Sequence, residues 1–155
     1  MILEKDSTHF LFVYGTLMQG FSNPFAKKLQ QNAIWRGKAS FTGQLFDLGT
    51  YPGAVYDQNA STTVQGEVWQ LNDFQKTIKA LDYYEGIHEK EPEYVRQQIP
   101  VLLESGEKID CWAYIYCLPT YLFELIPSGD HRQRLVATKQ HLWGLNVRNA
   151  VIALF

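Results

Sequence analysis

Glu85 is the residue of this sequence whose type and position best suit proton transfer. Phe74, Ile78 and Leu81 follow at spacings of four and three residues, which mark the apolar stripe of an α-helix. Continuing the stripe by four residues leads to Glu85, so the periodicity that buries Leu81 also directs a carboxylate inward. Burial and the carbonyl dipoles at a helix C-terminus both raise the pKa of such a carboxyl toward neutral pH. We therefore interpret Glu85 as a candidate general acid/base.

A second interpretation of Glu85 remains open on periodicity alone. In this interpretation the helix frays before Glu85, and the side chain reaches water or Arg96. Arg96 itself has two interpretations, because it could bind a substrate carboxylate or form a structural ion pair, for instance with Asp82. Glu67 could be a second carboxylate of the site, although a paired structural role is favoured for a charged residue within a strand.

The turn Tyr14–Gly15–Thr16–Leu17 is the second segment with chemical potential. Gly15 permits backbone angles that direct successive N–H groups to one side, which creates an anion-binding nest, and Thr16 adds a hydroxyl donor. A carboxylate is the natural small guest of such a turn. The alternative interpretation is an ordinary strand end without a ligand.

The elements that must position these residues can be located from apolar spacing and turn residues. We expect a strand over 10–14 that is buried on both faces, followed by a short helix from Asn23–Pro24 through Gln31. The remaining expected elements are bent strands over 34–48, a turn at 51–53, a strand over 64–71, a helix from Asp73 that ends at Gly86, a hairpin of strands over 94–103 and 108–117, and a helix over 130–143.

The order of these elements favours an α+β fold, a small mixed β-barrel with flanking helices. The chain lacks the strand–helix alternation of a doubly wound sheet, and glycines within the strands suit the bends of a barrel. We expect one domain over residues 1–155, with a core at about 10–130 and a helical, apolar C-terminal extension at about 130–155. The apolar segment at 147–155 is either a last strand or a docking tail.

Composition excludes several classes of function. The formal net charge is −2 without a basic run, which argues against nucleic acid as a partner. No apolar stretch reaches the roughly 20 residues of a membrane helix, and the N-terminus is not a basic-then-apolar signal peptide. Cys111 and Cys117 are six residues apart and the histidines are scattered, so no metal site is predicted. We expect a reduced, cytoplasmic protein, and no oligomeric state follows from the sequence.

The sequence resembles the γ-glutamylcyclotransferase-like family, the AIG2-like branch in particular. Each of the shared motifs is unspecific when taken alone, but together they occur in the order typical of that family over about the first 130 residues. They are Val13-Tyr14-Gly15-Thr16-Leu17, Tyr51-Pro52-Gly53, Gly66-Glu67-Val68-Trp69, Leu81-Asp82-Tyr83-Tyr84-Glu85-Gly86, Tyr94-Val95-Arg96, Trp112-Ala113-Tyr114-Ile115-Tyr116 and Ile126-Pro127-Ser128-Gly129-Asp130.

The resemblance implies an enzyme that needs no cofactor and no metal. It assigns Glu85 as the catalytic acid/base and the turn Tyr14, Gly15, Thr16, Leu17 as the contact to the γ-glutamyl head of a small-molecule substrate. The implied reaction is an intramolecular cyclisation that releases 5-oxoproline and a free amine or amino acid from a γ-glutamyl amine or peptide. The departing amine is not implied, and neither is a role for the extension at 131–155.

Three alternatives remain beside this assignment. A γ-glutamyl amidase would use water in place of the substrate's own amine. A non-catalytic barrel would keep the pocket and bind a small carboxylate. An interaction protein would use the segment at 147–155 for docking.

Overall fold

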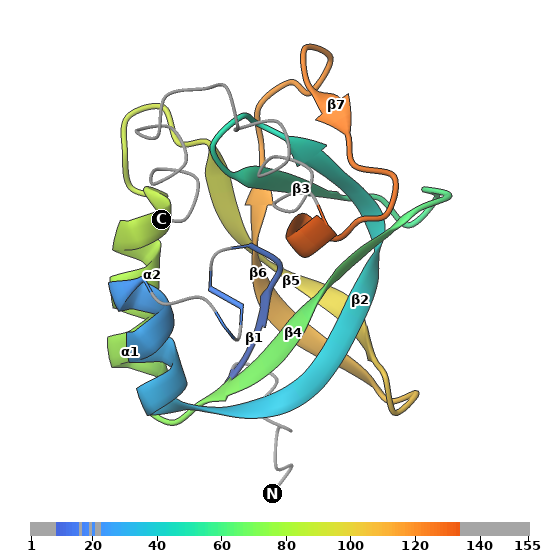
Figure 1. Cartoon of the computed structure of the whole chain (residues 1–155). Coiled ribbons are helices and arrows are strands. Elements are labelled where there is room, and N and C mark those ends of the chain that lie inside the picture. The colour runs from blue at the N-terminus through green and yellow to red at the C-terminus, as the bar shows by residue number, and fades with distance from the viewer. Residues whose placement is uncertain (1–8, 16, 19, 21–22, 134–155) are drawn as a thin grey trace, which may run out of the picture.

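The structure is a computed structural model that describes residues 9–15, 17–18, 20 and 23–133. Seven strands and two complete helices succeed one another in these residues (Figure 1). They are β1 (Phe10–Val13), α1 (Pro24–Asn32), β2 (Ala33–Asp47), β3 (Pro52–Tyr56), β4 (Thr63–Leu71), α2 (Phe74–Glu85), β5 (Tyr94–Leu103), β6 (Lys108–Tyr116) and β7 (Glu124–Leu125).

Five strands close into a barrel in the order β2-β4-β1-β6-β5. The barrel closes because β5 also pairs with β2, at Ala39↔Leu103 and Ser40↔Leu102. All of these neighbours are antiparallel except β1 and β6, which run parallel, so the barrel is mixed. The far end of β2 carries β3 and β7 as additional partners. The predicted α+β mixed barrel with flanking helices is therefore confirmed.

Strand β1 separates two hydrophobic cores. Its residue Phe12, together with Tyr14 just beyond its end, packs into the barrel interior, while Leu11 and Val13 face the layer between barrel and helices. Both faces of β1 are buried, as the sequence predicted. Helices α1 and α2 lie side by side against this outer layer (Figure 1), with the rings of Phe25 and Tyr84 4.3 Å apart.

Helix α2 has the bounds that its sequence signals predict. The Asp73 side chain caps the N-terminus by accepting a hydrogen bond from the Lys76 amide at 3.2 Å. Ile78 and Leu81 are buried, as their spacing requires. Gly86 ends the helix in the left-handed conformation with φ 69°, which a residue with a side chain rarely adopts.

The predicted turn at 51–53 is wrong. The turn spans 48–51 and shares only Tyr51 with the prediction. The Leu48 amide donates to the Tyr51 carbonyl, and Gly49 takes a φ of 107°. Pro52 begins β3 opposite Asp47, at the first residue of a strand, where proline is tolerated. The short strand β7 was also not predicted from the sequence.

Two further predictions concern the ends of β2 and of the chain. A register shift between Trp35 and Gly37 confirms the expected irregularity in β2. Helical structure begins at His131, but the rest of the predicted helix over 130–143 and the apolar segment at 147–155 lie outside the described residues. In the described part of the chain, no helix has the length and apolar character needed to span a membrane.

Candidate active site

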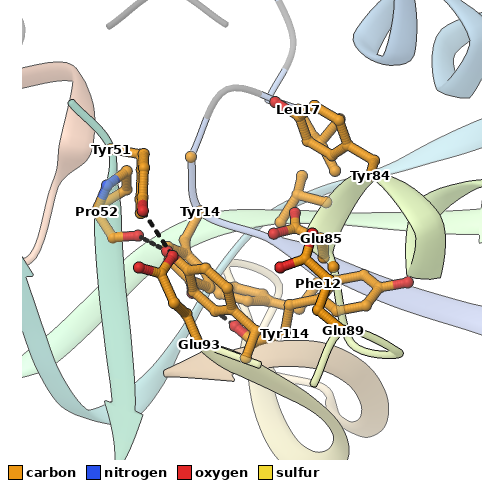
Figure 2. Close-up of a pocket in the computed structure, with 14 residues that line it drawn as sticks. Phe12, Tyr14, Leu17, Tyr51, Pro52, Tyr84, Glu85, Glu89, Glu93 and Tyr114 are labelled. Carbon is orange, nitrogen blue, oxygen red and sulfur yellow. Dashed lines mark hydrogen bonds between the residues drawn. The ribbon is translucent and has the colours of Figure 1, made fainter. Parts of the chain in front are cut away.

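A cavity of about 290 Å³ opens beside the C-terminal end of α2. The end of β1 and the turn after it form one wall, and the last turn of α2 with the following loop forms another. The beginnings of β3 and β5 complete it (Figure 2). Tyr114 of β6 also lines it, so the cavity lies where four separate stretches of the chain meet, at 12–17, 51–52, 84–94 and 114.

The structure places the predicted site residues around this cavity. Tyr14, Gly15 and Leu17 line it from the β1 side, and Glu85 lines it from α2. Thr16, which was predicted with them, lies outside the described residues. The helix stripe and the turn, which were identified separately in the sequence, thus face a common space.

The turn after β1 has backbone donors that are available to a ligand. The Met18 amide donates to the Gly15 carbonyl at 3.1 Å, which closes the turn. Among the described residues, no acceptor is bonded to the amides of Gly15 and Leu17. Pro52 lies close enough that a Cβ at Gly15 would sit 3.3 Å from its ring, so a small residue suits this wall. Such a turn can accommodate an anionic group.

Burial raises the pKa of Glu85 from 4.5 to about 8. Desolvation is the cause of this shift, and two carbonyls in the last turn of α2 accept capping hydrogen bonds. The Gly86 amide donates to the Tyr83 carbonyl and the Ile87 amide to the Asp82 carbonyl, each at 3.2 Å. A carboxyl that titrates near pH 8 can both accept and donate a proton at neutral pH.

The floor of the cavity consists of buried tyrosines in fixed orientations. The Tyr14 hydroxyl donates to the Tyr114 carbonyl at 2.6 Å and accepts from the Ala54 amide at 3.3 Å. The Tyr94 hydroxyl donates to the Pro52 carbonyl at 2.7 Å. Burial, and secondarily the Glu85 charge, raises the pKa of Tyr14, which stays a neutral hydroxyl. The floor is consequently rigid and uncharged.

Arg96 pairs with Asp82 and not with Glu85. Its guanidinium donates to both carboxylate oxygens of Asp82, at 2.9 and 3.3 Å, and stacks 4.6 Å from the ring centre of Trp112. The Tyr114 hydroxyl donates to the same carboxylate at 2.8 Å. The structural ion pair that the sequence left open is thus confirmed, and Arg96 does not line the cavity.

Glu67 has the paired role that the sequence analysis favoured. It is buried on β4, where its carboxylate accepts from Arg132 at 3.1 Å and from the Trp69 indole at 3.3 Å. It does not line the cavity.

The polar residues of the cavity that sequence reasoning missed include Tyr51, Glu89, Glu93 and Tyr94. The Tyr51 hydroxyl donates to Glu93 at 2.6 Å across 42 positions of sequence, and burial followed by this bond raises the pKa of Tyr51. Glu89 and Glu93 lie in the charged segment between α2 and β5, where the sequence predicted no helix or strand. Their spacing of four residues carries no signal outside a helix.

Potential metal ligands are dispersed over the part of the chain that the structure describes. No group of three or more His, Cys, Asp or Glu side chains there could hold a metal ion. Cys111 and Cys117 are both free thiols.

Comparison with known proteins gives a consistent result. The family model described as "Gamma-glutamyl cyclotransferase, AIG2-like" matches residues 11–133. The Escherichia coli protein named gamma-glutamylcyclotransferase family protein YtfP is 33% identical over 131 residues, which cover 80% of this chain and 96% of that protein. A Niallia circulans protein named gamma-L-glutamyl-butirosin B gamma-glutamyl cyclotransferase is 32% identical over 114 residues, covering 72% of this chain and 69% of that one.

Solved structures agree on the fold. The solution structure of ytfP from Escherichia coli superposes with a TM-score of 0.58 at 34% identity, covering 81% of this chain and 97% of that one. An aig2-like protein from Mus musculus superposes with a TM-score of 0.57 at 24% identity, covering 74% and 82% of the two chains, which shows the common fold alone.

Proposed function

Because the chain belongs to the γ-glutamyl cyclotransferase family of the AIG2-like type, we propose that it releases 5-oxoproline and a free amine or amino acid from a γ-glutamyl substrate. The observation that carries this proposal is the cavity in which Glu85 and the turn at Gly15 and Leu17 face a common space. On one side of the cavity is a carboxyl with a pKa raised to about 8, and on the other are amides that no acceptor among the described residues occupies. These groups suit a substrate with an amine and a carboxylate.

The amides of the turn bind the α-carboxylate of the γ-glutamyl head. This contact bends the head so that its α-nitrogen lies near both Glu85 and the γ-carbonyl carbon. Nucleophile and electrophile belong to one molecule, so the principal task of the protein is to hold them in the reactive geometry. The rigid tyrosine floor keeps the cavity in the shape of this folded head.

Glu85 transfers one proton in the reaction. Its carboxylate removes a proton from the α-ammonium, and the freed amine attacks the γ-carbonyl carbon to form a five-membered ring. Glu85 then gives that proton to the leaving nitrogen as the bond between this nitrogen and the γ-carbon breaks. The ring nitrogen loses a second proton to water, which is balanced by the proton that the free amine takes up from water. Glu85 returns to its initial state.

The test is release of 5-oxoproline from a panel of γ-glutamyl amines and γ-glutamyl amino acids. Loss of a general acid/base costs about 10²–10⁴-fold in rate. We expect Glu85→Gln to lower kcat/KM by at least about 10²-fold, while Glu91→Gln, an exposed carboxylate outside the cavity, keeps the wild-type rate. Undiminished release by Glu85→Gln would refute the role of Glu85.

Two other results separate the alternatives. Release of free glutamate in place of 5-oxoproline would indicate an amidase that uses water as the nucleophile. Binding of 5-oxoproline or glutamate without release from any substrate of the panel would indicate a non-catalytic binding barrel.

A further inference from the structure

Two of the sequence motifs, at 66–69 and 126–130, take no part in the chemistry of the cavity. Both lie within the described residues, and neither contributes a side chain to the cavity lining. The structure brings them together, because the Gln65 amide donates to the Gly129 carbonyl at 2.8 Å. The backbones approach so closely that a Cβ at Gly129 would overlap the Thr63 carbonyl. The second motif is therefore fixed against β4, next to the first.

Strand β4 is packed just as closely on β1. In their antiparallel pairing, Glu67 lies opposite Val13, the last residue of β1. The neighbouring Gly66 has no room for a side chain, because a Cβ there would overlap the Val13 carbonyl oxygen and the Phe12 ring. The turn at Gly15 begins two residues after Val13. Its starting point is consequently set by the position of β4 at Glu67.

The Glu67 carboxylate connects two side chains that come from different segments. One oxygen accepts from Arg132 at 3.1 Å, and the other accepts from the Trp69 indole at 3.3 Å. The Glu67 side chain is only 7% exposed, whereas that of Arg132 is 45% exposed. A carboxylate so deeply buried requires a compensating charge. Arg132, from the start of the C-terminal extension, supplies this charge.

Both partners of Glu67 border the turn and the segment after it. Trp69 belongs to the buried cluster that includes Leu17 and Met18. On the other side, a Cβ at Gly20 would lie 3.5 Å from Nη1 of Arg132, so the guanidinium lies against the backbone there. One buried carboxylate thus orients an indole on one side of this segment and a guanidinium on the other.

We propose that Arg132, through its ion pair with Glu67, is a positioning residue that holds the turn at Gly15 and Leu17 in the conformation that binds the substrate carboxylate. Arg132 does not line the cavity, so it acts through Glu67 and not on the substrate. This assignment rests on the proposed function, in which the turn holds the γ-glutamyl head. It also gives the start of the C-terminal extension a role in the site.

The Arg132→Gln variant provides the test, with kcat and KM for 5-oxoproline release and the Kd of 5-oxoproline by calorimetry as readouts. The turn binds the carboxylate in substrate and transition state alike, so a displaced turn raises KM and leaves kcat nearly unchanged. We expect KM and Kd to rise about tenfold, as loss of one charge-assisted hydrogen bond would cause, and kcat to stay within about twofold of wild type. A purely structural role would instead lower the folded fraction, and with it kcat, at an unchanged KM.

Three further variants locate the effect. Arg132→Lys keeps the charge and should recover part of the affinity. Glu67→Gln keeps an acceptor for Trp69 but removes the charge, so it should raise KM as Arg132→Gln does. The double variant of Glu67→Gln and Arg132→Gln should be no worse than either single variant, because the two side chains act as one pair. If Arg132→Gln does not fold, Glu67→Gln replaces it.

Arg36→Gln is the matched control. It removes an exposed arginine that donates to Gln70 of the same strand β4 at 3.4 Å, away from the cavity lining. Its KM, kcat and Kd should equal those of wild type.

Unchanged KM and Kd in Arg132→Gln or in Glu67→Gln, effects that multiply in the double variant, or a loss of kcat at unchanged KM would overturn the assignment and leave the proposed function intact. Arg132→Lys with the affinity of Arg132→Gln would also overturn it. Wild-type protein that binds 5-oxoproline but releases none would contradict the proposed function, and the Kd values alone would then decide the role of Arg132. Wild-type protein that neither binds nor releases it would remove both proposals.

Discussion

Asp82 and Glu85 are carboxylates one turn apart on α2, yet their surroundings differ. Asp82 is buried and has three hydrogen bonds, two from Arg96 and one from Tyr114. Glu85 faces the cavity, and burial raises its pKa to about 8. A buried carboxylate that is paired with a cation and hydrogen-bonded can hold the helix end in place. A carboxylate whose ionised form is destabilised by burial is instead suited to proton transfer.

The two roles depend on each other. The Asp82 ion pair attaches the last turn of α2 to β5 and β6, and Glu85 belongs to that turn. Its position relative to Gly15 therefore depends on contacts that it does not make itself. Four predictions examine this division between the two carboxylates.

Asp82→Asn should have the largest effect on stability. The substitution leaves Arg96 partly buried without its counter-charge, and loss of one partner of a buried pair costs about 3–5 kcal/mol. Because the Arg96 side chain is 23% exposed, we expect about 3–4 kcal/mol in urea unfolding. Asp110→Asn, at an exposed position of β6, is the control and should stay within about 0.5 kcal/mol of wild type. An equally mild effect of Asp82→Asn would contradict its structural role.

The pH dependence of stability should reveal the penalty on Glu85. Its folded pKa of about 8 exceeds the ordinary value of 4.5, so the native state binds a proton that the unfolded state has lost in this range. Stability associated with Glu85 is complete below about pH 4.5 and is lost as pH rises through about 8. We expect a loss of about 3 kcal/mol, less than the ~5 kcal/mol that the full shift implies, because solvent reaches the cavity.

The measurement compares wild type with Glu85→Gln by urea unfolding at pH 5 and pH 9. Other titrating groups cancel in the difference between the two proteins. Glu85→Gln should gain stability relative to wild type at the higher pH. A difference that does not change with pH would mean that Glu85 is not penalised by burial.

Tyr114→Phe should lower stability by about 1.5–2 kcal/mol, because it removes a hydrogen bond to a charged group and leaves the Arg96 contacts in place. The readout is urea unfolding. Tyr121→Phe, at a side chain that is 82% exposed, loses the same hydroxyl and should be neutral. Equal effects of the two substitutions would show that Tyr114 does not support Asp82.

Gly86→Ala should have the smallest effect on stability, a loss of about 1 kcal/mol. It should also lower kcat/KM. Its φ of 69° disfavours alanine, as does the φ of 93° at Gly106. An added Cβ at Gly86 would lie 2.9 Å from the Glu89 carboxyl carbon, whereas nothing lies within 4 Å at Gly106. We expect similar Tm values for Gly86→Ala and Gly106→Ala and a lower kcat/KM for Gly86→Ala alone. Equal activities would exclude an influence of Gly86 on the neighbouring Glu85.

Local signals made α2 predictable. The cap at Asp73, the apolar stripe and the glycine at 86 act within one segment, so the sequence contains the whole explanation of its bounds. The turn before β3 was mispredicted for the same local reason. Pro52 and Gly53 occur often in turns, but here Gly49 supplies the positive φ and Pro52 begins a strand.

The cavity depends on contacts between remote segments. Barrel closure joins Ala39 to Leu103, and the Tyr51–Glu93 bond joins the turn before β3 to the loop before β5. Neither pairing has a periodicity or a fixed spacing that reveals it in one sequence. The carboxylates that line the cavity beside Glu85 could therefore not be identified beforehand.

The sequence by itself determined the strand–helix order, the ends of α2 and the face from which Glu85 projects, because helix periodicity and capping act over a few residues. Only the tertiary structure decided that Arg96 pairs with Asp82 and that Glu93 joins the cavity. It also decided how far burial raises the pKa of Glu85, a shift whose direction the helix periodicity had indicated. The physical reason is that desolvation and charge pairing depend on which remote strands pack around a side chain, and the barrel sets those neighbours.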